Sequence, residues 1–167
     1  ELVALMVANI LGQLRTGAAS GVGARYMARK DAKVAGLFGS GSQARTQLEA
    51  LCCAIPLEQV KVFSRSAEKR EKFVAAMKDK VSAELVPVES ATEAVKGSAI
   101  VCTMTTAREP VFDGGDLEPG TTVIPAGSNR VTNREVDDET FRRAARGRIA
   151  TDDIDGAKIE SGDLVRA

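Results

Sequence analysis

The 167-residue sequence contains no histidine, so the most common general base and the most common metal ligand in proteins are both missing. Any proton transfer must therefore involve lysine, aspartate, glutamate or water. The three cysteines form no CxxC pair, because Cys52 and Cys53 are adjacent and Cys102 is distant. This spacing indicates buried free thiols, and we expect neither a metal site nor a disulfide framework.

An excess of charge and long apolar runs are also lacking. The 23 basic and 23 acidic residues balance, so the composition favours neither nucleic acid nor a membrane surface as a partner. The longest apolar stretch falls far short of the ~20 residues that span a bilayer. The opening residues 1–3 lack the basic start of a signal peptide. With 44% hydrophobic residues, we expect one compact, soluble, cytoplasmic unit.

The sequence does contain a glycine turn between an apolar run and a helix-like stretch. The run at residues 34–38 precedes Gly39-Ser40-Gly41-Ser42-Gln43-Ala44, and residues 45–54 follow. Strand, glycine turn and helix in this order are typical of a dinucleotide site, in which the helix N-terminus offers free N–H groups to the diphosphate. Gly39 permits the tight turn, Gly41 lets backbone approach a pyrophosphate, and Ala44 allows close helix packing. An ordinary glycine-rich turn is the alternative.

The end of the next predicted strand, residues 59–63, favours NADP(H) over NAD(H). NAD sites prefer a carboxylate here, which binds the adenosine ribose hydroxyls. This chain has Ser64-Arg65-Ser66 instead, with Lys69 and Arg70 one helical turn further on. A guanidinium flanked by hydroxyls complements a 2′-phosphate by charge and by several donors. Alternatively, Arg65 is a solvated residue at a helix start, since Ser66 would make a good N-cap for residues 67–78.

The rest of the chain continues the alternation of strand-like and helix-like segments. Strands are predicted over residues 84–88, 98–103, 121–126 and 148–151, and helices over residues 67–78, 90–96 and 137–146. About six alternating strands predict an α/β fold, the doubly wound parallel sheet of the Rossmann NAD(P)-binding fold with strand order 3-2-1-4-5-6. Ligands of such sheets bind beyond the carboxyl ends of the strands.

Two further strand ends carry candidate site residues at that edge. The segment Thr103-Met104-Thr105-Thr106 would place hydroxyls and backbone beside the nicotinamide ribose, although a polar loop start is equally consistent with it. In Ala126-Gly127-Ser128-Asn129-Arg130, Gly127 permits close approach and Asn129 offers both a donor and an acceptor to a ring or substrate. We assign Thr103, Met104, Thr105, Gly127 and Ser128 to the cofactor site.

The first 28 residues lie outside a minimal fold of this kind. They read as nearly continuous helix with apolar residues at helical spacing (Leu2, Met6, Ile10 and Leu14), followed by a break of small residues at 15–21. Arg15 lies in that break, and a guanidinium beside closely packed glycine and alanine usually meets a buried anion. A substrate carboxylate is one candidate for the anion, and an internal carboxylate is the other.

Several motifs together resemble the ornithine cyclodeaminase/mu-crystallin family, essentially end to end. They are Leu14-Arg15-Thr16-Gly17-Ala18-Ala19-Ser20-Gly21, Ala24-Arg25-Tyr26, the glycine turn at 39–44, residues 103–106, Gly127-Ser128-Asn129 with Arg134-Glu135-Val136-Asp137, and Glu160-Ser161-Gly162-Asp163-Leu164. The resemblance implies a cofactor domain joined to a separate substrate and dimerisation domain. It also implies homodimers and hydride transfer at the α-carbon of an amino or imino acid.

The resemblance assigns roles to particular residues. It implies that Arg15 holds the substrate carboxylate, that Thr16 belongs to the cofactor site, and that residues 64–66 form a 2′-phosphate pocket. Family members that convert ornithine to proline and ammonia carry an aspartate where this chain has Asn129, and a neutral amide cannot handle the side-chain amine equally well. We therefore expect a ketimine-reductase or alanine-dehydrogenase type, with Asn129 as the candidate catalytic residue. Ornithine cyclodeamination and non-enzymatic, NADP-dependent ligand binding are the alternatives.

The resemblance further implies a fragment. The family's catalytic lysine and a second carboxylate-binding arginine lie upstream of the Arg15 segment, where this chain has no counterpart. We expect residues 1–30 to connect from a substrate and dimerisation domain outside the chain, residues 31–155 to form the Rossmann domain, and residues 156–167 to begin the return to the dimerisation domain.

Overall fold

The computed structural model describes residues 2–166, and within them five parallel strands form one sheet in the order β3-β2-β1-β4-β5. The strands are β1 (Val34–Phe38), β2 (Gln59–Phe63), β3 (Glu84–Pro87), β4 (Ile100–Thr103) and β5 (Thr122–Pro125). The strand order 3-2-1-4-5 confirms the predicted doubly wound sheet, and its switch point lies between β1 and β4.

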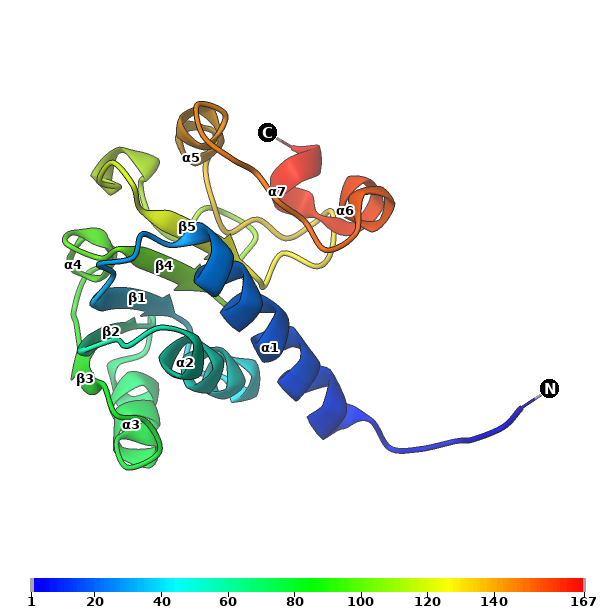
Figure 1. The fold of residues 1–167 in the computed structure, drawn as a ribbon, viewed down its shortest axis with the longest axis horizontal. Helices are drawn as coiled ribbons and strands as arrows, with labels where there is room; N and C mark the ends of the chain where they lie inside the picture. Colours follow the sequence, from blue (N-terminus) through cyan, green and yellow to red (C-terminus); the bar gives the residue numbers. More distant parts are fainter. Residues whose placement is uncertain (1, 167) are drawn as a thin grey trace.

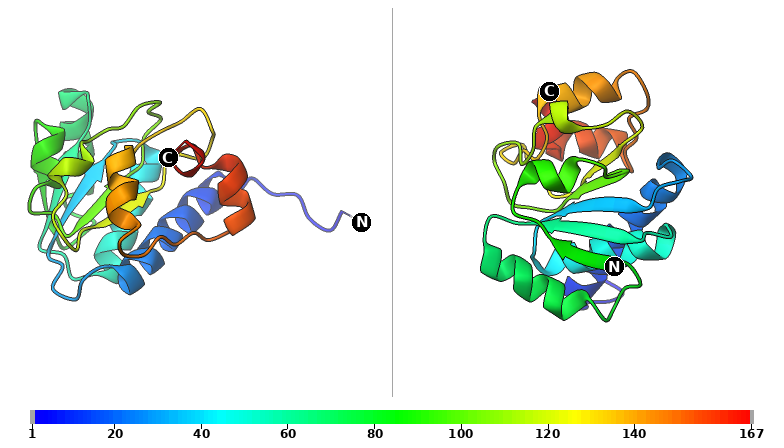
Figure 2. Two further views of the ribbon diagram at one scale, coloured as in Figure 1. Left: turned by 90° about the horizontal axis from the view of Figure 1, so that it is seen from above. Right: turned by 90° about the vertical axis from the view of Figure 1, so that its left-hand side faces the viewer.

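Helices alternate with these strands and cover both faces of the sheet (Figure 1). They are α1 (Asn9–Met27), α2 (Ser42–Ala54), α3 (Ala67–Met77), α4 (Ala91–Val95), the short 3-10 helix η1 (Gly114–Asp116), α5 (Asp138–Ala144), α6 (Ile154–Glu160) and α7 (Gly162–Val165). Figure 2 shows the layers from two further directions. None of the described helices combines the length and the apolar character needed to cross a membrane.

Two buried clusters lie on opposite faces of the sheet. Side chains alternate along a strand, so Leu37 of β1 packs into one cluster and Phe38 into the other. The first cluster joins the sheet to α1, α2 and α3, and the second joins it to α4 and the segment around η1. The two clusters hold the strands rigidly, which fixes the positions of the loops at their carboxyl ends.

Helix α1 is continuous, and the predicted break at residues 15–21 is wrong. Gly17 faces Thr46 of α2, and Gly21, one turn later, faces Ala50. A Cβ on Gly17 would lie 2.5 Å from the Thr46 carbonyl oxygen, and one on Gly21 would lie 3.0 Å from the Ala50 carbonyl oxygen. The small residues therefore permit close packing of two parallel helices, and this tertiary contact outweighs the low helix propensity of glycine.

The start of the N-terminal helix also differs from the prediction. Helix α1 begins at Asn9, whereas residues 2–8, including Leu2 and Met6, are non-helical and exposed and extend away from the sheet (Figure 1). A helix of this size depends on packing of its apolar face, and these residues pack against nothing in the described chain. The predicted first residue, Glu1, lies outside the described residues.

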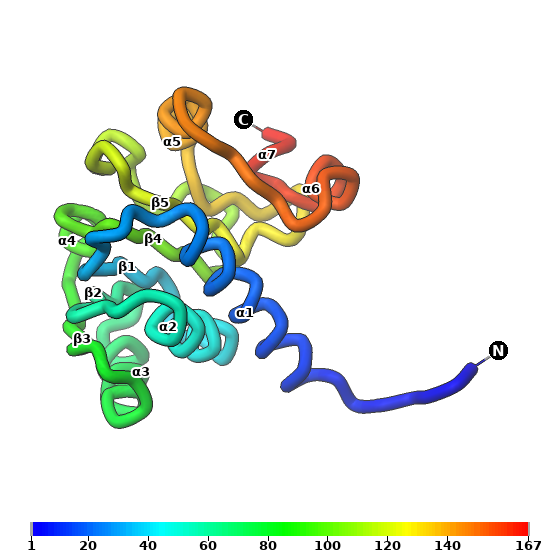
Figure 3. The backbone as a smooth tube through the Cα atoms, in the orientation of Figure 1, coloured from blue at the N-terminus to red at the C-terminus, as the bar shows by residue number. Residues whose placement is uncertain are grey.

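The sixth strand predicted at residues 148–151 is absent from the described part of the chain. This segment is exposed and non-repetitive, and in Figure 3 the tube between α5 and α6 passes outside the sheet. Its apolar content is too small to bury a strand against β5. The chain then turns through α6 into α7, which lies beside the loops at the carboxyl edge of the sheet.

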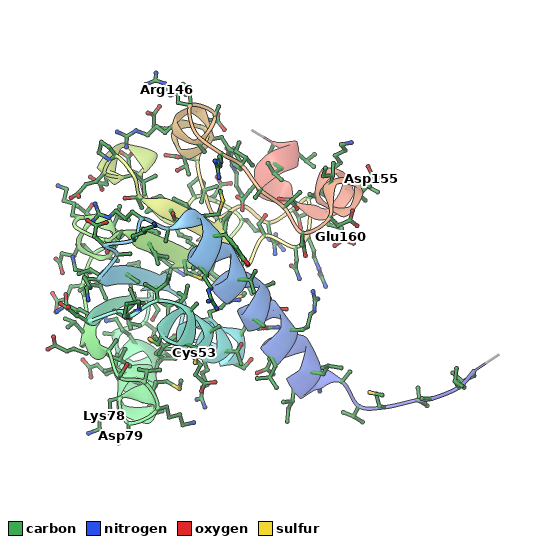
Figure 4. All side chains as sticks on the ribbon, in the orientation of Figure 1. Cys53, Lys78, Asp79, Arg146, Asp155 and Glu160 are labelled. Atoms are coloured by element: carbon green, nitrogen blue, oxygen red, sulfur yellow. The ribbon has the colours of Figure 1, made fainter. Side chains whose placement is uncertain are left out.

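The three cysteines are free thiols in the structure. Cys53 is exposed near the C-terminal end of α2 (Figure 4), so the prediction of a buried thiol is wrong for this residue, whereas Cys102 is buried in β4. Burial raises the pKa of Cys52 to about 11, and burial also raises the pKa of Cys102 above its ordinary value. These shifts make the two thiols poor nucleophiles near neutral pH.

Candidate functional site

Gly39 brings the ends of three strands together. Its N–H donates to the Phe63 carbonyl oxygen at 2.9 Å, which ties the end of β1 to the end of β2. Its φ of +118° lies in the region that only glycine adopts readily. A Cβ here would also clash with the carbonyl oxygen of Met104, just after β4. The turn that the sequence predicted at Gly39 is therefore required by conformation and by space.

The N-terminus of α2 is open beside this turn. Gly41 is the N-cap residue, and among the described residues no side chain accepts a hydrogen bond from the N–H groups of the first turn of α2. A Cβ built on Gly41 has no neighbour within 4 Å. Residues Ser42 and Gln43 therefore present free backbone N–H groups and the positive end of the helix dipole to open space. This arrangement fits a diphosphate, whose oxygens accept such donors.

Ala44, the last position of the glycine motif, is fully buried between α2 and the sheet. Its small side chain lets α2 pack closely on β1, as predicted. Ser40 is half-buried in the turn, and Ser42 is exposed at the helix start. The six residues of the predicted motif thus form the turn after β1 and the first residues of α2.

The end of β2 carries the helix cap that the sequence suggested, next to an exposed arginine. Ser66 caps α3, because its Oγ accepts from the Lys69 N–H at 3.3 Å. The hydroxyl of Ser64 donates to the Ser66 carbonyl oxygen at 3.0 Å. Arg65 is exposed, and none of the ion pairs among the described residues includes it. Both hydroxyls that flank Arg65 thus bond within the chain, whereas the exposed Arg65 guanidinium remains available to an anion.

Arg70 lies beneath this strand end and is almost fully buried. Its Nη1 donates to the Ser64 carbonyl oxygen at 3.1 Å, while its Nε is buried without a partner among the described residues. A buried guanidinium raises the positive potential at the strand end and fixes the backbone that carries Arg65. The side chain of Arg70 thus strengthens the cationic character that the sequence predicted there.

A buried carboxylate that the sequence analysis did not assign joins the ends of β4 and β5. Glu135 is fully buried. Its Oε1 accepts from the Thr105 N–H at 2.6 Å and the Thr105 hydroxyl at 2.7 Å, and its Oε2 accepts from the Thr103 hydroxyl at 2.8 Å and the Gly127 N–H at 2.7 Å. Burial raises the pKa of Glu135, and the hydrogen bonds from Thr105, Thr103 and Gly127 oppose that rise. Only the motif at 134–137 hinted at this residue.

Gly127 lies so close to this carboxylate that no side chain would fit between them. A Cβ there would lie 2.5 Å from the Thr105 carbonyl oxygen and 2.6 Å from Oε1 of Glu135. The predicted close approach at Gly127 is real, and the groups that approach belong to the chain itself. Thr103 is buried and Thr105 half-buried, and both of their hydroxyls donate to Glu135, so these hydroxyls bond within the chain.

Asp163 fixes the backbone of the residue that carries this carboxylate. Its Oδ1 accepts from the Glu135 N–H at 2.7 Å and from the Val136 N–H at 3.1 Å, and its own N–H donates to the Ser128 Oγ at 3.1 Å. The hydroxyl of Ser128 in turn donates to the Asn133 carbonyl oxygen at 3.1 Å. The predicted cofactor residue Ser128 thus uses its hydroxyl within the chain. Asn129, by contrast, is exposed, with its N–H donating to the Gly127 carbonyl oxygen at 3.0 Å.

Helix α1 places Arg15 at the same edge of the sheet. Because α1 and α2 are parallel and Gly17 faces Thr46, Arg15 lies at the level of the first turn of α2. It lies two residues before Gly17, about 200° around the helix, and therefore points away from α2. Arg15 is exposed, and no described carboxylate forms an ion pair with it, so the internal carboxylate suggested as its partner is not found among the described residues. Thr16 is half-buried and donates its hydroxyl to the Gly12 carbonyl oxygen at 2.8 Å.

Two shallow concavities of about 390 Å³ do not include the glycine loop. One lies against α6 and α7, and the other lies between residues 108–109 and 131–132, in the loops that follow β4 and β5. Both are open surface depressions, whereas the glycine loop offers directed donors. The described residues contain no group of three Cys, Asp or Glu side chains arranged to hold a metal ion.

Comparison with known proteins places this geometry in context. The model of the ornithine cyclodeaminase/mu-crystallin family matches residues 1–164. Alanine dehydrogenase of Archaeoglobus fulgidus is 35% identical over 157 residues, which are 93% of this chain and 47% of that protein. The chain spans about half the length of the curated relatives it matches.

Solved structures agree with the sequence comparison. Δ1-Pyrroline-2-carboxylate reductase of Thermococcus litoralis, solved with NADH and L-proline, superposes with a TM-score of 0.89 at 40% identity, covering 98% of this chain and 50% of that one. An archaeal alanine dehydrogenase dimer with bound NAD has a TM-score of 0.84 at 33% identity, covering 95% and 48%. The chain is therefore similar over nearly its whole length to nucleotide-binding proteins.

Proposed function

Because this chain belongs to the ornithine cyclodeaminase/mu-crystallin family, we propose that it is the dinucleotide-binding portion of an oxidoreductase acting at the α-carbon of an amino or imino acid. The observation that carries the proposal is the open N-terminus of α2 behind Gly39 and Gly41. The similar reductase of Thermococcus litoralis, solved with NADH and L-proline, supports it.

The chain's residues would hold the cofactor at the carboxyl edge of the sheet. The backbone N–H groups of Ser42 and Gln43 face the space in which a diphosphate fits. The backbone beyond β4, at Met104 and Thr105, lies beside Gly39 and forms the next part of the same edge. When bound, the nicotinamide would exchange a hydride with the substrate, and the chain would supply its binding and orientation.

We propose that the cofactor is NADP(H) in preference to NAD(H). The two solved relatives described above contain NADH and NAD, so the preference rests on this chain's own residues. Arg65 is exposed at the end of β2, Lys69 is exposed on the first turn of α3, and Arg70 is buried beneath them. Three cationic side chains at the site of the adenosine ribose favour a 2′-phosphate over a free hydroxyl.

We propose that the substrate's carboxylate binds Arg15 and that Asn129 faces the reacting part of the substrate. Arg15 is exposed at the level of the first turn of α2, and Asn129 is exposed just beyond β5. Both side chains are free of the hydrogen-bond network around Glu135. The neutral amide of Asn129 favours imine reduction or amino-acid dehydrogenation over ornithine cyclodeamination.

The exposed apolar residues near the N-terminus support a further domain and a homodimer as proposals. Val3, Leu5 and Val7 are each more than 90% exposed, and Ile10 and Leu14 of α1 are also largely exposed. Soluble proteins rarely leave such a contiguous apolar patch uncovered. We expect this segment to connect to the substrate and dimerisation domain, with residues 31–155 as the cofactor domain and the segment from residue 156 to 167 as the return. Glu1 and Ala167 lie outside the described residues.

The activity is tested in a full-length enzyme that contains this chain. In the reductive direction, a cyclic imino acid, or pyruvate with ammonia, is offered with NADPH. In the oxidative direction, L-alanine is offered with NADP⁺. The change in NADPH is followed at 340 nm. Turnover of an imino or amino acid is expected. Cofactor binding without turnover of either would support a ligand-binding protein, and release of ammonia from ornithine would support cyclodeamination.

A further inference from the structure

The hydrogen-bonding capacity of Glu135 is completely used by the ends of two strands. Each of its carboxylate oxygens accepts two hydrogen bonds, one pair from Thr105 and one pair from Thr103 and Gly127. An ionised carboxylate has about four acceptor positions, so this surrounding of four donors matches it. A glutamine, whichever way it is turned, would place its NH₂ group against a backbone N–H, of Thr105 or of Gly127, which cannot reverse as a hydroxyl can. The arrangement therefore favours a carboxyl group over the isosteric amide.

The groups that Glu135 holds lie at the nicotinamide side of the proposed cofactor site. Thr103 ends β4, Thr105 follows it, and Gly127 follows β5, on the opposite side of the sheet's switch point from the end of β2. The Met104 carbonyl oxygen between the two threonines packs against Gly39. This segment therefore borders the glycine loop on its β4 side, whereas the end of β2 lies across β1 from it.

The position of Glu135 is itself fixed. Asp163, 1% exposed, accepts from the backbone N–H groups of Glu135 and Val136. Gly162 packs so tightly that a Cβ there would lie 2.6 Å from the Arg130 carbonyl oxygen. Helix α7 thus holds the loop that follows β5, and through it the Glu135 side chain.

From this geometry we propose that Glu135 is a positioning residue for the nicotinamide half of the cofactor. It acts through Thr103, Thr105 and Gly127, whose backbone forms the β4 and β5 side of the site, and it does not contact the cofactor itself. The proposal rests on the function proposed above. It predicts that loss of the carboxylate affects binding of the nicotinamide half and leaves binding of the adenine half unchanged.

The test compares two ligands on the same variants of this chain. NADPH carries both halves of the cofactor, whereas adenosine 2′,5′-bisphosphate carries only the adenine half. Glu135→Gln is expected to weaken NADPH binding about tenfold or more, because buried donors lose their acceptors. Binding of adenosine 2′,5′-bisphosphate should stay within about twofold of its value for the unmodified chain. Isothermal titration calorimetry measures both affinities.

Asp137→Asn is the matched control. The Asp137 carboxylate accepts from the Gly114 N–H, the Thr140 N–H and the Thr140 hydroxyl, each at 2.8 Å, and so resembles Glu135 in its bonding. These partners belong to η1 and α5, away from the glycine loop. Asp137→Asn should therefore destabilise the chain while leaving NADPH affinity within about twofold.

The outcomes separate this proposal from the proposed function. If the unmodified chain binds neither ligand nor NADH, the proposed function fails. If it binds them, and Glu135→Gln weakens both ligands equally or neither, the positioning role is wrong. If Glu135→Gln does not fold, Thr105→Val decides by the same comparison, since it removes one donor to Glu135 and keeps the carboxylate.

Discussion

The Asp163 carboxylate accepts a hydrogen bond from the backbone N–H of Glu135 at 2.7 Å, which ties helix α7 to the loop that carries the buried glutamate. The two residues lie 28 positions apart in the sequence. The same Oδ1 also accepts from the Val136 N–H. The carboxyl edge of the sheet is therefore stabilised by a segment that follows the last strand.

This contact predicts a specific loss of stability. Asp163→Ala leaves two buried N–H groups without acceptors, and we expect it to lower the free energy of unfolding by about 2–4 kcal/mol. Asp155→Ala is the control, because Asp155 is exposed on α6 (Figure 4) and pairs only with Lys158 at 3.4 Å. The control should change stability by less than about 0.5 kcal/mol. Urea unfolding measures both, and equal small effects would show that the Asp163 contact adds little.

The buried glutamate predicts a pH-dependent difference in stability. Burial raises the pKa of Glu135 in the folded chain above its unfolded value, so the folded chain binds this proton more readily. By linkage, its contribution to stability is fully present below the unfolded pKa, about 4.3, and is lost as pH rises through the folded pKa. The stability deficit of Glu135→Gln relative to the unmodified chain should therefore shrink as pH rises from about 4 to 7.

Urea unfolding of both chains across this range provides the measurement, and subtracting the two curves removes the contributions of other groups. A deficit that grows with rising pH would contradict the raised pKa. A carboxylate that is costly to bury yet surrounded by four donors is more typical of a functional site than of a stabilising core contact.

We expect Arg65 to determine the preference for NADPH over NADH. NADPH should bind more tightly than NADH, and Arg65→Ala should remove most of the difference, because a charge-assisted contact to the 2′-phosphate contributes roughly 1.5–3 kcal/mol. Arg146→Ala is the control, since Arg146 is an exposed arginine near the end of α5, away from β2 (Figure 4). Nicotinamide fluorescence reports both affinities. Equal affinities of the unmodified chain for NADPH and NADH would contradict this assignment of the β2 end.

We expect substitution of Arg15 to weaken catalysis on the substrate and to leave cofactor affinity unchanged. In a full-length enzyme containing this chain, Arg15→Lys should lower kcat/KM for an amino or imino acid by roughly 10- to 100-fold, because an ammonium cannot form the two-pronged contact of a guanidinium with a carboxylate. NADPH affinity should stay within about twofold. Arg29→Lys, at an exposed arginine just beyond α1, is the control. Near-normal turnover of Arg15→Lys would rule out the carboxylate role.

The sequence predicted the features that depend on neighbours along the chain. Strand β1, the glycine turn and α2 follow one another directly, and their apolar pattern and glycines belong to one short segment. Ser66 as the cap of α3 was predicted for the same reason. The continuity of α1 was missed because Gly17 and Gly21 are explained only by α2, which lies far along the chain.

Glu135 shows why part of the site could not be predicted. Its partners Thr103 and Thr105 lie about thirty residues earlier, and a single acidic residue in a polar loop carries no periodic signal. The threonines were predicted as cofactor ligands because their hydroxyls follow a strand. In the structure both hydroxyls are used by Glu135, a relationship that exists only after β4 and β5 are paired.

The open N-terminus of α2 is the proposed binding site of the cofactor diphosphate, and Gly41→Val tests this role most directly. A side chain on Gly41 meets nothing in the chain within 4 Å, so the fold should be retained, but it would occupy the space of the diphosphate. Gly23→Val is the control, since a Cβ there also has no neighbour within 4 Å and the residue lies on α1. We predict an unchanged circular dichroism spectrum for both variants and loss of NADPH binding for Gly41→Val alone. Near-normal NADPH binding by a folded Gly41→Val would contradict the account.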